Sequence, residues 1–171
     1  MSNRLSTIGP AATHEIGTLA GLMREVIEPL AYYNETARRA EIAKYQPAAL
    51  LAMIAEDPQS VLVARDADGL TGFCLSGYDD ATIWLYWFGV AQRARGRALG
   101  SALIAALGAT LASRGAHKVW CDTRTDNKES ISVLERAGFR CVATLANHWH
   151  NQDYHIWEWY PPSAQSPTPT G

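Results

Sequence analysis

The stretch ARGRALGSALIAAL, from Ala94 to Leu107, brings arginine and glycine together directly before an apolar run with helical spacing. The first N–H groups of a helix have no partner within it, and they carry about half a unit of positive charge. Glycine lets the backbone come close to a ligand, and arginine adds charge-assisted hydrogen bonds to phosphate. The stretch therefore predicts a binding site for an anion, and for a pyrophosphate in particular. A basic turn that only caps a surface helix is the structural alternative.

Two histidines lie close together near the end of the chain, in the stretch NHWHNQDYH. His148 and His150 flank Trp149, and this spacing is compatible with a metal site. No third ligand is evident in the sequence, and histidines of a solvated loop are the ordinary interpretation. We therefore expect no metal ion here.

The elements that would position these residues follow from the apolar pattern. Residues 60–90 are rich in β-branched and aromatic side chains and are divided by DADG and DDA, which predicts three consecutive strands joined by tight turns. Apolar residues at helical spacing predict helices at 13–30, 35–44, 47–56, 127–138 and in the run that ends near residue 114. The predicted strands are 4–8, 60–65, 70–78, 81–90, 117–123, 139–145 and 153–160. This order predicts an α/β fold with a mixed, mostly antiparallel sheet and one βαβ crossover.

Length and composition bound the domain organisation. A chain of 171 residues suffices for one domain with a substantial core, which we expect to span residues 1–160. Residues 161–171 are rich in Pro, Ser and Thr, which predicts a disordered tail. A net charge of −2 argues against a broad nucleic-acid interface. No apolar run reaches the ~20 residues of a membrane helix, and no secretory signal is apparent at the start.

The three cysteines indicate the redox state of the protein. Cys74, Cys121 and Cys141 are odd in number, form no CxxC pair, and each lie in an apolar run. This pattern predicts reduced, buried thiols in a cytoplasmic protein.

The Arg-Gly stretch resembles the acetyl-CoA signature of the GCN5-related N-acetyltransferases, the GNAT family. In that family a strand ends in valine, a short turn follows, and Arg/Gln-x-x-Gly-x-Gly/Ala begins a helix. The segment VAQRARGRALG has the same order, with Val90 at the strand end and Arg95, Ala98 and Gly100 in signature positions.

Ala98 tests this alignment, because it stands where the first signature glycine usually lies. A slipped register that begins at Arg93 also fits the formula, but it moves Val90 away from the strand end. If position 98 requires a positive φ, alanine is strained there by about 1 kcal/mol. If the position already lies in the helix, alanine is harmless.

A second block, NKESISVLERAGF, resembles the family's next signature, Asn-x-x-Ala/Ser-x-x-Leu-Tyr-x-x-x-Gly-Phe. Asn127, Ser130, Gly138 and Phe139 match it. In the family the asparagine and the small residue often contact the cofactor, whereas a helix cap alone is the structural interpretation of Asn127. Leu134 departs from the family, which commonly has a tyrosine there as the acid that protonates the departing CoA thiolate.

The resemblance implies an N-acetyltransferase that uses acetyl-CoA as co-substrate and transfers acetyl directly to a primary amine of a small molecule or protein. Backbone N–H groups near residues 88–90 would bind the pantetheine and polarise the thioester carbonyl, and those of residues 95–101 would hold the pyrophosphate. The implied cofactor-binding residues are Phe88, Gly89, Val90, Arg95, Gly96, Arg97, Ala98, Leu99, Gly100, Ser101, Asn127 and Ser130.

The acceptor amine must arrive neutral, which requires a base or a water chain. The family often places a carboxylate on the fourth strand, but IWLYWFGV has no acid. The candidate catalytic residues are Tyr86, Asp122, His148 and His150, with Glu28 and Asp153 as further candidate bases. Aromatic faces attract cations, so an aromatic pocket would fit an amine. The expected acceptor-binding residues are Glu28, Tyr32, Tyr33, Trp87 and Trp149, with His150 beside them.

Two other classes of function are weighed against the enzyme. A non-catalytic acyl-CoA-binding module of the same fold would explain both Leu134 and the acid-free strand. A nucleotide-binding α/β domain would use the Arg-Gly turn for another phosphate, but the second block argues against it. Dimers are frequent in the family, so a homodimer is a further expectation, with no nucleic-acid and no membrane partner.

Overall fold

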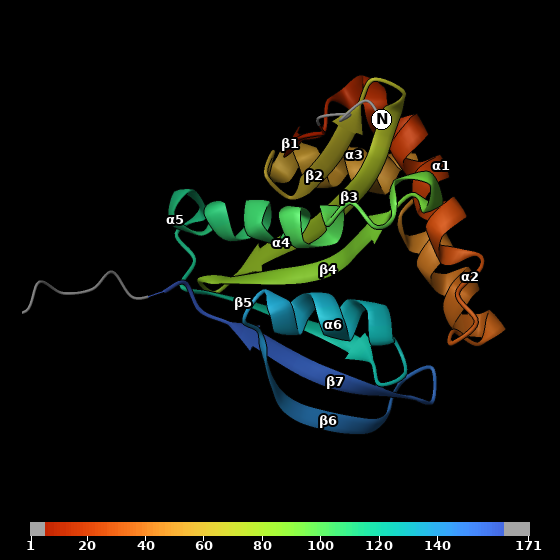
Figure 1. Cartoon of the computed structure of the whole chain (residues 1–171), viewed down its shortest axis with the longest axis vertical. Coiled ribbons are helices and arrows are strands. Elements are labelled where there is room, and N and C mark those ends of the chain that lie inside the picture. Colours follow the sequence, from red (N-terminus) through yellow and green to blue (C-terminus); the bar gives the residue numbers. More distant parts are fainter. Residues whose placement is uncertain (1–5, 163–171) are drawn as a thin grey trace, which may run out of the picture.

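The computed structural model describes residues 6–162 as one seven-stranded sheet with helices on both faces (Figure 1). The strands lie in the order β1-β2-β3-β4-β5-β7-β6, and every neighbouring pair is antiparallel except β4 and β5. The predicted α/β class with a mixed, mostly antiparallel sheet is confirmed. The predicted tail lies outside the described residues from position 163 onward. The strands are β1 (Thr7–Pro10), β2 (Val61–Asp66), β3 (Gly69–Asp79), β4 (Thr82–Val90), β5 (Lys118–Arg124), β6 (Arg140–Trp149) and β7 (Gln152–Trp159).

Helices cover the sheet from two sides. A Cβ at Gly72 of β3 would meet Leu103 of α4, while the next residue, Phe73, lies on the opposite face toward Val26 of α1. The crossover between the parallel strands β4 and β5 contains α4, as predicted, and α6 packs beside it. The helices are η1 (Thr13–Glu15), α1 (Ile16–Ile27), α2 (Glu35–Lys44), α3 (Pro47–Glu56), η2 (Gln92–Ala94), α4 (Leu99–Ala109), α5 (Leu111–Arg114) and α6 (Lys128–Arg136).

Four elements differ from the predictions by more than two residues, and one of them is β6, which continues to Trp149 instead of ending at residue 145. The first strand is Thr7–Pro10 instead of 4–8. The predicted helix 13–30 begins as a 3-10 turn and ends at Ile27, because Pro29 has no backbone N–H with which to continue the helical hydrogen bonds. The predicted run to residue 114 is divided into α4 and the short α5, which ends at Gly115 with a φ of +67°.

The prediction for the cysteines is correct for two of the three. Cys74 and Cys121 are buried in the core, but Cys141 is exposed. The reason is its strand: β6 is the last strand of the sheet, and all its residues are exposed. An apolar run on an edge strand does not imply burial.

The parallel strands β4 and β5 stay together for only part of their length. They pair from Thr82 with Lys118 to Leu85 with Cys121, and then they separate (Figure 1). Beyond this point β4 continues along β3, and β5 continues along β7. The separation leaves one side of β4 without a strand partner from Tyr86 onward.

Ala98 occupies the residue before α4 with φ +57° and ψ +18°, which is the left-handed conformation. An L-residue other than glycine is disfavoured there, because its Cβ crowds the following carbonyl. The alignment of the sequence with the GNAT signature placed Ala98 at a usual glycine position, and the positive φ agrees with that alignment. The turn is therefore built for glycine but carries alanine.

We predict that Ala98→Gly raises the free energy of unfolding by about 1 kcal/mol, because it relieves the left-handed strain. Chemical denaturation followed by circular dichroism measures the change. The matched control is Ala102→Gly, the same substitution on the exposed face of α4, which is expected to lower the stability by about 1 kcal/mol. A loss of stability in both variants would contradict the assignment of strain.

Candidate active site

Two cavities meet beside the unpaired part of β4. One has a volume of about 490 Å³ and lies between β4, β5, α2 and the β6–β7 hairpin; we call it the aromatic cavity. The other has a volume of about 540 Å³ and lies at the start of α4; we call it the helix-start cavity. Trp87, Phe88, Asn127 and Ser130 line both. A ligand that extends from the start of α4 would therefore reach the aromatic cavity through the gap between β4 and β5.

The helix-start cavity collects nearly all the residues that the sequence predicted for cofactor binding. Its predicted residues are Phe88, Gly89, Val90, Arg95, Gly96, Ala98, Leu99, Gly100, Ser101, Asn127 and Ser130. Arg97 does not line it, because its guanidinium bonds Asp66 at 3.1 Å, together with Arg93 at 3.2 Å. The cationic side chains on this cavity are Arg95 and Arg136.

The start of α4 has the properties of an anion site. Gly96 adopts φ +78°, and a Cβ there would have no atom within 4 Å, so this turn faces open space. Within the described residues, the backbone N–H groups of residues 96–101 form no hydrogen bond, as in the first turn of any helix. These donors and the Arg95 side chain suit a pyrophosphate.

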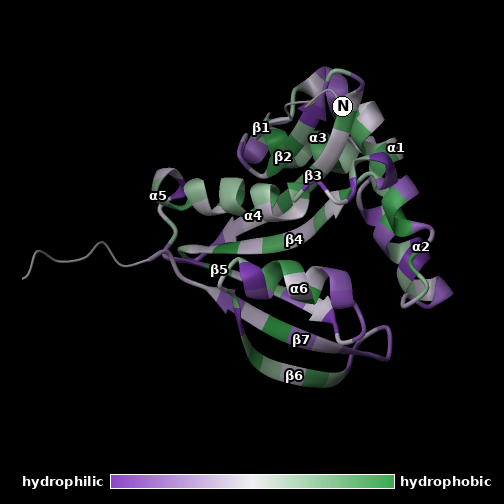
Figure 2. Ribbon diagram, in the orientation of Figure 1, coloured by the Kyte–Doolittle hydropathy of each residue, from purple (hydrophilic) through white to green (hydrophobic). Residues whose placement is uncertain are grey.

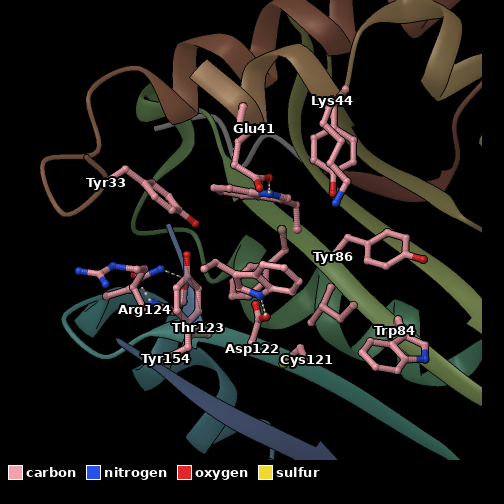
Figure 3. Close-up of a pocket in the computed structure, with 18 of the residues that line it drawn as sticks. Tyr33, Glu41, Lys44, Trp84, Tyr86, Cys121, Asp122, Thr123, Arg124 and Tyr154 are labelled. Carbon is pink, nitrogen blue, oxygen red and sulfur yellow. Dashed lines mark hydrogen bonds between the residues drawn. The ribbon is translucent and has the colours of Figure 1, made fainter. Parts of the chain in front are cut away.

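A β-bulge aims Trp87 into the aromatic cavity. The pairing with β3 passes from Trp87 opposite Leu75 to Leu85 opposite Ser76, so Tyr86 is an extra residue on β4. Bulges of this kind redirect side chains near functional sites. The Trp87 indole N–H donates to a Glu41 carboxylate oxygen of α2 at 2.7 Å (Figure 3). Sequence analysis missed Glu41, because nothing in the pattern of α2 sets it apart from a surface carboxylate.

Asp122 lies on β5 directly after the last residue that pairs with β4. Its carboxylate lines the aromatic cavity and accepts a hydrogen bond from the Trp149 indole at 2.8 Å (Figure 3). Burial raises the pKa of Asp122, while the Trp149 hydrogen bond and the nearby His148 and Lys44 act in the opposite direction. A carboxylate with a raised pKa inside a cavity is a better proton acceptor than an exposed one.

Of the other predicted catalytic residues, some line the aromatic cavity and some do not. Tyr86 and His150 line the aromatic cavity. His148 lines neither cavity; its ring packs against Trp149, with centroids 4.6 Å apart. Asp153 accepts a hydrogen bond from the backbone of Asn147 at 2.9 Å, which fixes the hairpin.

The predicted acceptor-binding residues divide between the two cavities. Tyr33 and Trp149 line the aromatic cavity, and Trp87 lines both. Tyr32 lines the helix-start cavity instead. Glu28 lines neither, and it lies just beyond the end of α1.

Tyr154 of β7 offers a proton donor that the sequence analysis missed. It lines the aromatic cavity together with Tyr33. Burial raises the pKa of Tyr154 to about 12, with a further contribution from the Asp122 charge. Leu134, at the family's usual tyrosine position, is fully buried in the core. A protonated hydroxyl is therefore present in the cavity, but it comes from β7 and not from α6.

Asn127 has the capping role that the sequence left open, and its contact with the cofactor stays a prediction. Its side chain caps α6 by accepting from the Ser130 N–H at 3.1 Å, and its amide donates to the Ser130 hydroxyl at 2.9 Å. The same two residues line both cavities. Capping therefore holds the Asn127 side chain at the point where the cavities meet.

The connection between α1 and α2 is tied to the β6–β7 hairpin. The Asn34 amide donates to the His150 carbonyl at 3.0 Å, and the Gln152 amide donates to the Tyr32 carbonyl at 3.0 Å. These bonds join segments that are more than one hundred residues apart in sequence. They hold the connection next to the hairpin at the aromatic cavity, which Tyr33 and His150 line.

The described residues contain no group of three His, Cys, Asp or Glu side chains suited to a metal ion. In the same part of the chain, no helix has the length and apolar character needed to cross a membrane.

Comparison with known proteins identifies the family. Residues 23–139 match the model of the acetyltransferase (GNAT) family, which covers more than half of the chain. The chain belongs to the GNAT family. The folds of GNAT proteins with known structure agree with this assignment. PaiA N-acetyltransferase from Thermoplasma acidophilum, in complex with coenzyme A, has a TM-score of 0.77 at 16% identity, over 92% of this chain and 99% of that one.

Two further relatives illustrate the range of similar proteins. The ribosomal-protein-S18-alanine N-acetyltransferase from Escherichia coli has a TM-score of 0.68 at 15% identity, over 91% of this chain and 94% of that one. Mycothiol acetyltransferase from Clavibacter sepedonicus is 42% identical over 88 residues, which are 51% of this chain. The chain spans less than a third of the length of that curated relative, 29%.

We predict that Trp149→Phe raises the pKa of Asp122 further, because the indole hydrogen bond that favours the carboxylate is lost. An NMR titration of the Asp122 carboxyl carbon measures this pKa. Trp159→Phe is the matched control, since Trp159 packs against Phe139, away from Asp122. A lower pKa in Trp149→Phe would mean that the indole acts mainly by excluding water.

Proposed function

We propose that this GNAT protein is an N-acetyltransferase that transfers acetyl from acetyl-CoA to a primary amine by direct attack. The observation that carries the proposal is the meeting of the helix-start cavity and the aromatic cavity beside the unpaired part of β4. One cavity suits a pyrophosphate and the other holds the partly buried Asp122 carboxylate. Acetyl-CoA supplies the activated acetyl thioester. The protein binds and orients both substrates and transfers the protons.

The residues of the two cavities have distinct parts in this proposal. The first turn of α4 and Arg95 bind the pyrophosphate, and the free side of β4 near Phe88 hydrogen-bonds the pantetheine. Asp122 takes a proton from the ammonium, so the neutral nitrogen forms a bond to the acetyl carbon while the carbon–sulfur bond breaks. Tyr154 gives its proton to the departing thiolate, which leaves as CoA thiol. The nitrogen then loses its second proton, which restores the Tyr154 hydroxyl and leaves a neutral amide, and Asp122 releases the first proton to solvent.

We predict micromolar binding of acetyl-CoA to the wild-type protein and its loss in Gly96→Glu, as measured by calorimetry. A glutamate at the turn repels the pyrophosphate. Gly96→Ala is the matched control: it has the same unfavourable φ of +78° and no steric contact, but no charge, so binding persists. Equal loss in both variants would assign the effect to the backbone, and no binding to the wild type would overturn the proposal.

A non-catalytic acyl-CoA-binding module is the second candidate, and the burial of Leu134 favours it because the usual acid is missing. The two candidates differ in thiol release. An enzyme releases free CoA thiol when acetyl-CoA and an accepted amine are both present, whereas a binding module does not. If CoA thiol is released faster with the amine than without it, the protein is not a binding module.

We further propose that the protein works in the cytoplasm, where its buried thiols Cys74 and Cys121 stay reduced, and that it forms a homodimer through β6. The β6 edge has no charge between Arg140 and Asn147, and Figure 2 shows apolar residues along it. Natural proteins usually protect such edges with proline or charge, as the other edge does with Pro10 in the short β1. Antiparallel pairing of two β6 strands about a two-fold axis would satisfy both edges.

We predict that Leu145→Lys on β6 converts the dimer to a monomer, because a charge on each strand opposes pairing. Light scattering coupled to gel filtration measures the mass. Leu51→Lys on α3 is the matched control, since Leu51 is exposed to a similar extent, 41% against 37%, but lies away from β6. A monomeric wild type, or equal dissociation of both variants, contradicts the β6 interface.

A further inference from the structure

The lining of the aromatic cavity is selective among amines. Nine of its twenty lining residues are Phe, Trp or Tyr. Its charged side chains are two carboxylates, Glu41 and Asp122, and two cations, Lys44 and Arg124. The charges balance, so the cavity has no excess of negative charge to hold an acceptor with several ammonium groups. One ammonium beside one carboxylate, with an apolar body against the rings, matches this lining.

The carboxylate and the rings are spaced for such a molecule. Asp122 and Trp120 are two residues apart on β5, so they point to the same face, about 6–7 Å apart along the strand. Trp120 pairs in register with Trp84 of β4, and their rings meet edge to face with centroids 4.2 Å apart. An amine at Asp122 would therefore place a group two or three bonds away against these two indoles.

A neighbouring cation indicates that the rings of this cavity attract ammonium groups. The Lys44 ammonium lies 5.2 Å from the centroid of the Tyr45 ring and 5.6 Å from that of the Tyr86 ring. Room for the Tyr86 ring is made by Gly77 of β3, where a Cβ would lie 2.1 Å from the Tyr86 hydroxyl oxygen. The aromatic walls are thus available for both stacking and cation–π contacts.

A polypeptide acceptor fits the cavity less well. The bonds from Asn34 to His150 and from Gln152 to Tyr32 tie the α1–α2 connection to the hairpin beside the cavity. Trp149 extends from the hairpin to Asp122, where its indole donates to the carboxylate at 2.8 Å. A peptide that enters needs partners for each backbone N–H and C=O, and the faces of the nine aromatic rings in the lining provide none.

We propose that the acceptor is a small monoamine in which a short carbon tether joins the primary amine to an aromatic ring. The ring lies against Trp84 and Trp120, and the amine lies at Asp122. This inference rests on the proposed acetyl transfer for its chemistry, but it makes a separate statement about which amine binds.

The experiment compares three acceptors on the whole protein with saturating acetyl-CoA, with release of CoA thiol as the signal. The acceptors are 2-phenylethylamine, putrescine and a short peptide with an N-terminal alanine. We expect kcat/KM for 2-phenylethylamine to exceed the other two at least tenfold. A preference for putrescine or for the peptide overturns the inference and leaves acetyl transfer intact.

A second arm tests the position of the ring. Trp120→Leu keeps an apolar side chain but removes the indole, so we expect KM for 2-phenylethylamine to rise about tenfold. We expect kcat and the Kd for acetyl-CoA to stay nearly unchanged. Tyr78→Leu is the matched control, because Tyr78 is an exposed ring on β3 outside the cavity. An equal rise in KM for both variants, or no rise in Trp120→Leu, overturns the placement.

Direct binding separates failure of this inference from failure of the proposed function. Tryptophan fluorescence is titrated with each acceptor in the presence of CoA, without turnover. If no amine releases thiol but 2-phenylethylamine binds more tightly than putrescine, acetyl transfer fails and the acceptor class stands. If 2-phenylethylamine does not bind more tightly than putrescine, the proposed class of acceptor is wrong.

Discussion

The site depends on the incomplete pairing of two parallel strands. Had β4 and β5 stayed paired beyond Leu85 and Cys121, the backbone groups of β4 near Phe88 would be used within the sheet. Because the strands separate, those groups and the space beside them are free for a ligand. Unpaired backbone groups in a protein interior are unfavourable unless something binds them. The gap is therefore a cost in stability that a bound pantetheine would offset.

Packing on both sides keeps the gap open. On the β4 side, a Cβ at Gly89 would lie 2.6 Å from the Phe73 ring, so the strand is packed too closely against the core to move. On the β5 side, antiparallel pairing with β7 holds residues Asp122 to Arg124, and Trp157 donates to the Thr123 hydroxyl at 2.9 Å. Each strand is fixed to its own neighbours, and neither is free to close the gap.

The sequence predicted the parts of the protein that short-range rules determine. The helices α2 and α3 have the predicted bounds, since Asn34 caps one by bonding Ala37 and Pro47 begins the other. The helix-start cavity was also predictable, because one continuous stretch forms its turn. Contacts over long separations were not predictable. Arg97 faces Asp66, which is 31 residues away, and no local pattern records that pair.

The aromatic cavity shows the same limit more strongly, because it takes one residue at a time from distant elements. Glu41 comes from α2 and Tyr154 from β7, and each looks ordinary in its own segment. Conversely, His148 stood out in sequence but does not line the cavity; its ring packs against Trp149, in the part of β6 whose pairing with β7 is irregular. A residue of a type suited to catalysis lies in a site only if the register of its strand points its side chain there.

Two indole–carboxylate hydrogen bonds connect α2 and the β6–β7 hairpin to the two strands that line the aromatic cavity. Trp87 holds Glu41 of α2, and Trp149 holds Asp122 from the hairpin. Each hydrogen bond positions both an indole ring of the cavity lining and a carboxylate inside the cavity. The position of Trp149 and the pKa of Asp122 are therefore coupled. A change in the hairpin therefore alters the proton affinity of Asp122 without any change on β5. In this fold, the loop that would select the acceptor also tunes the group that would deprotonate it.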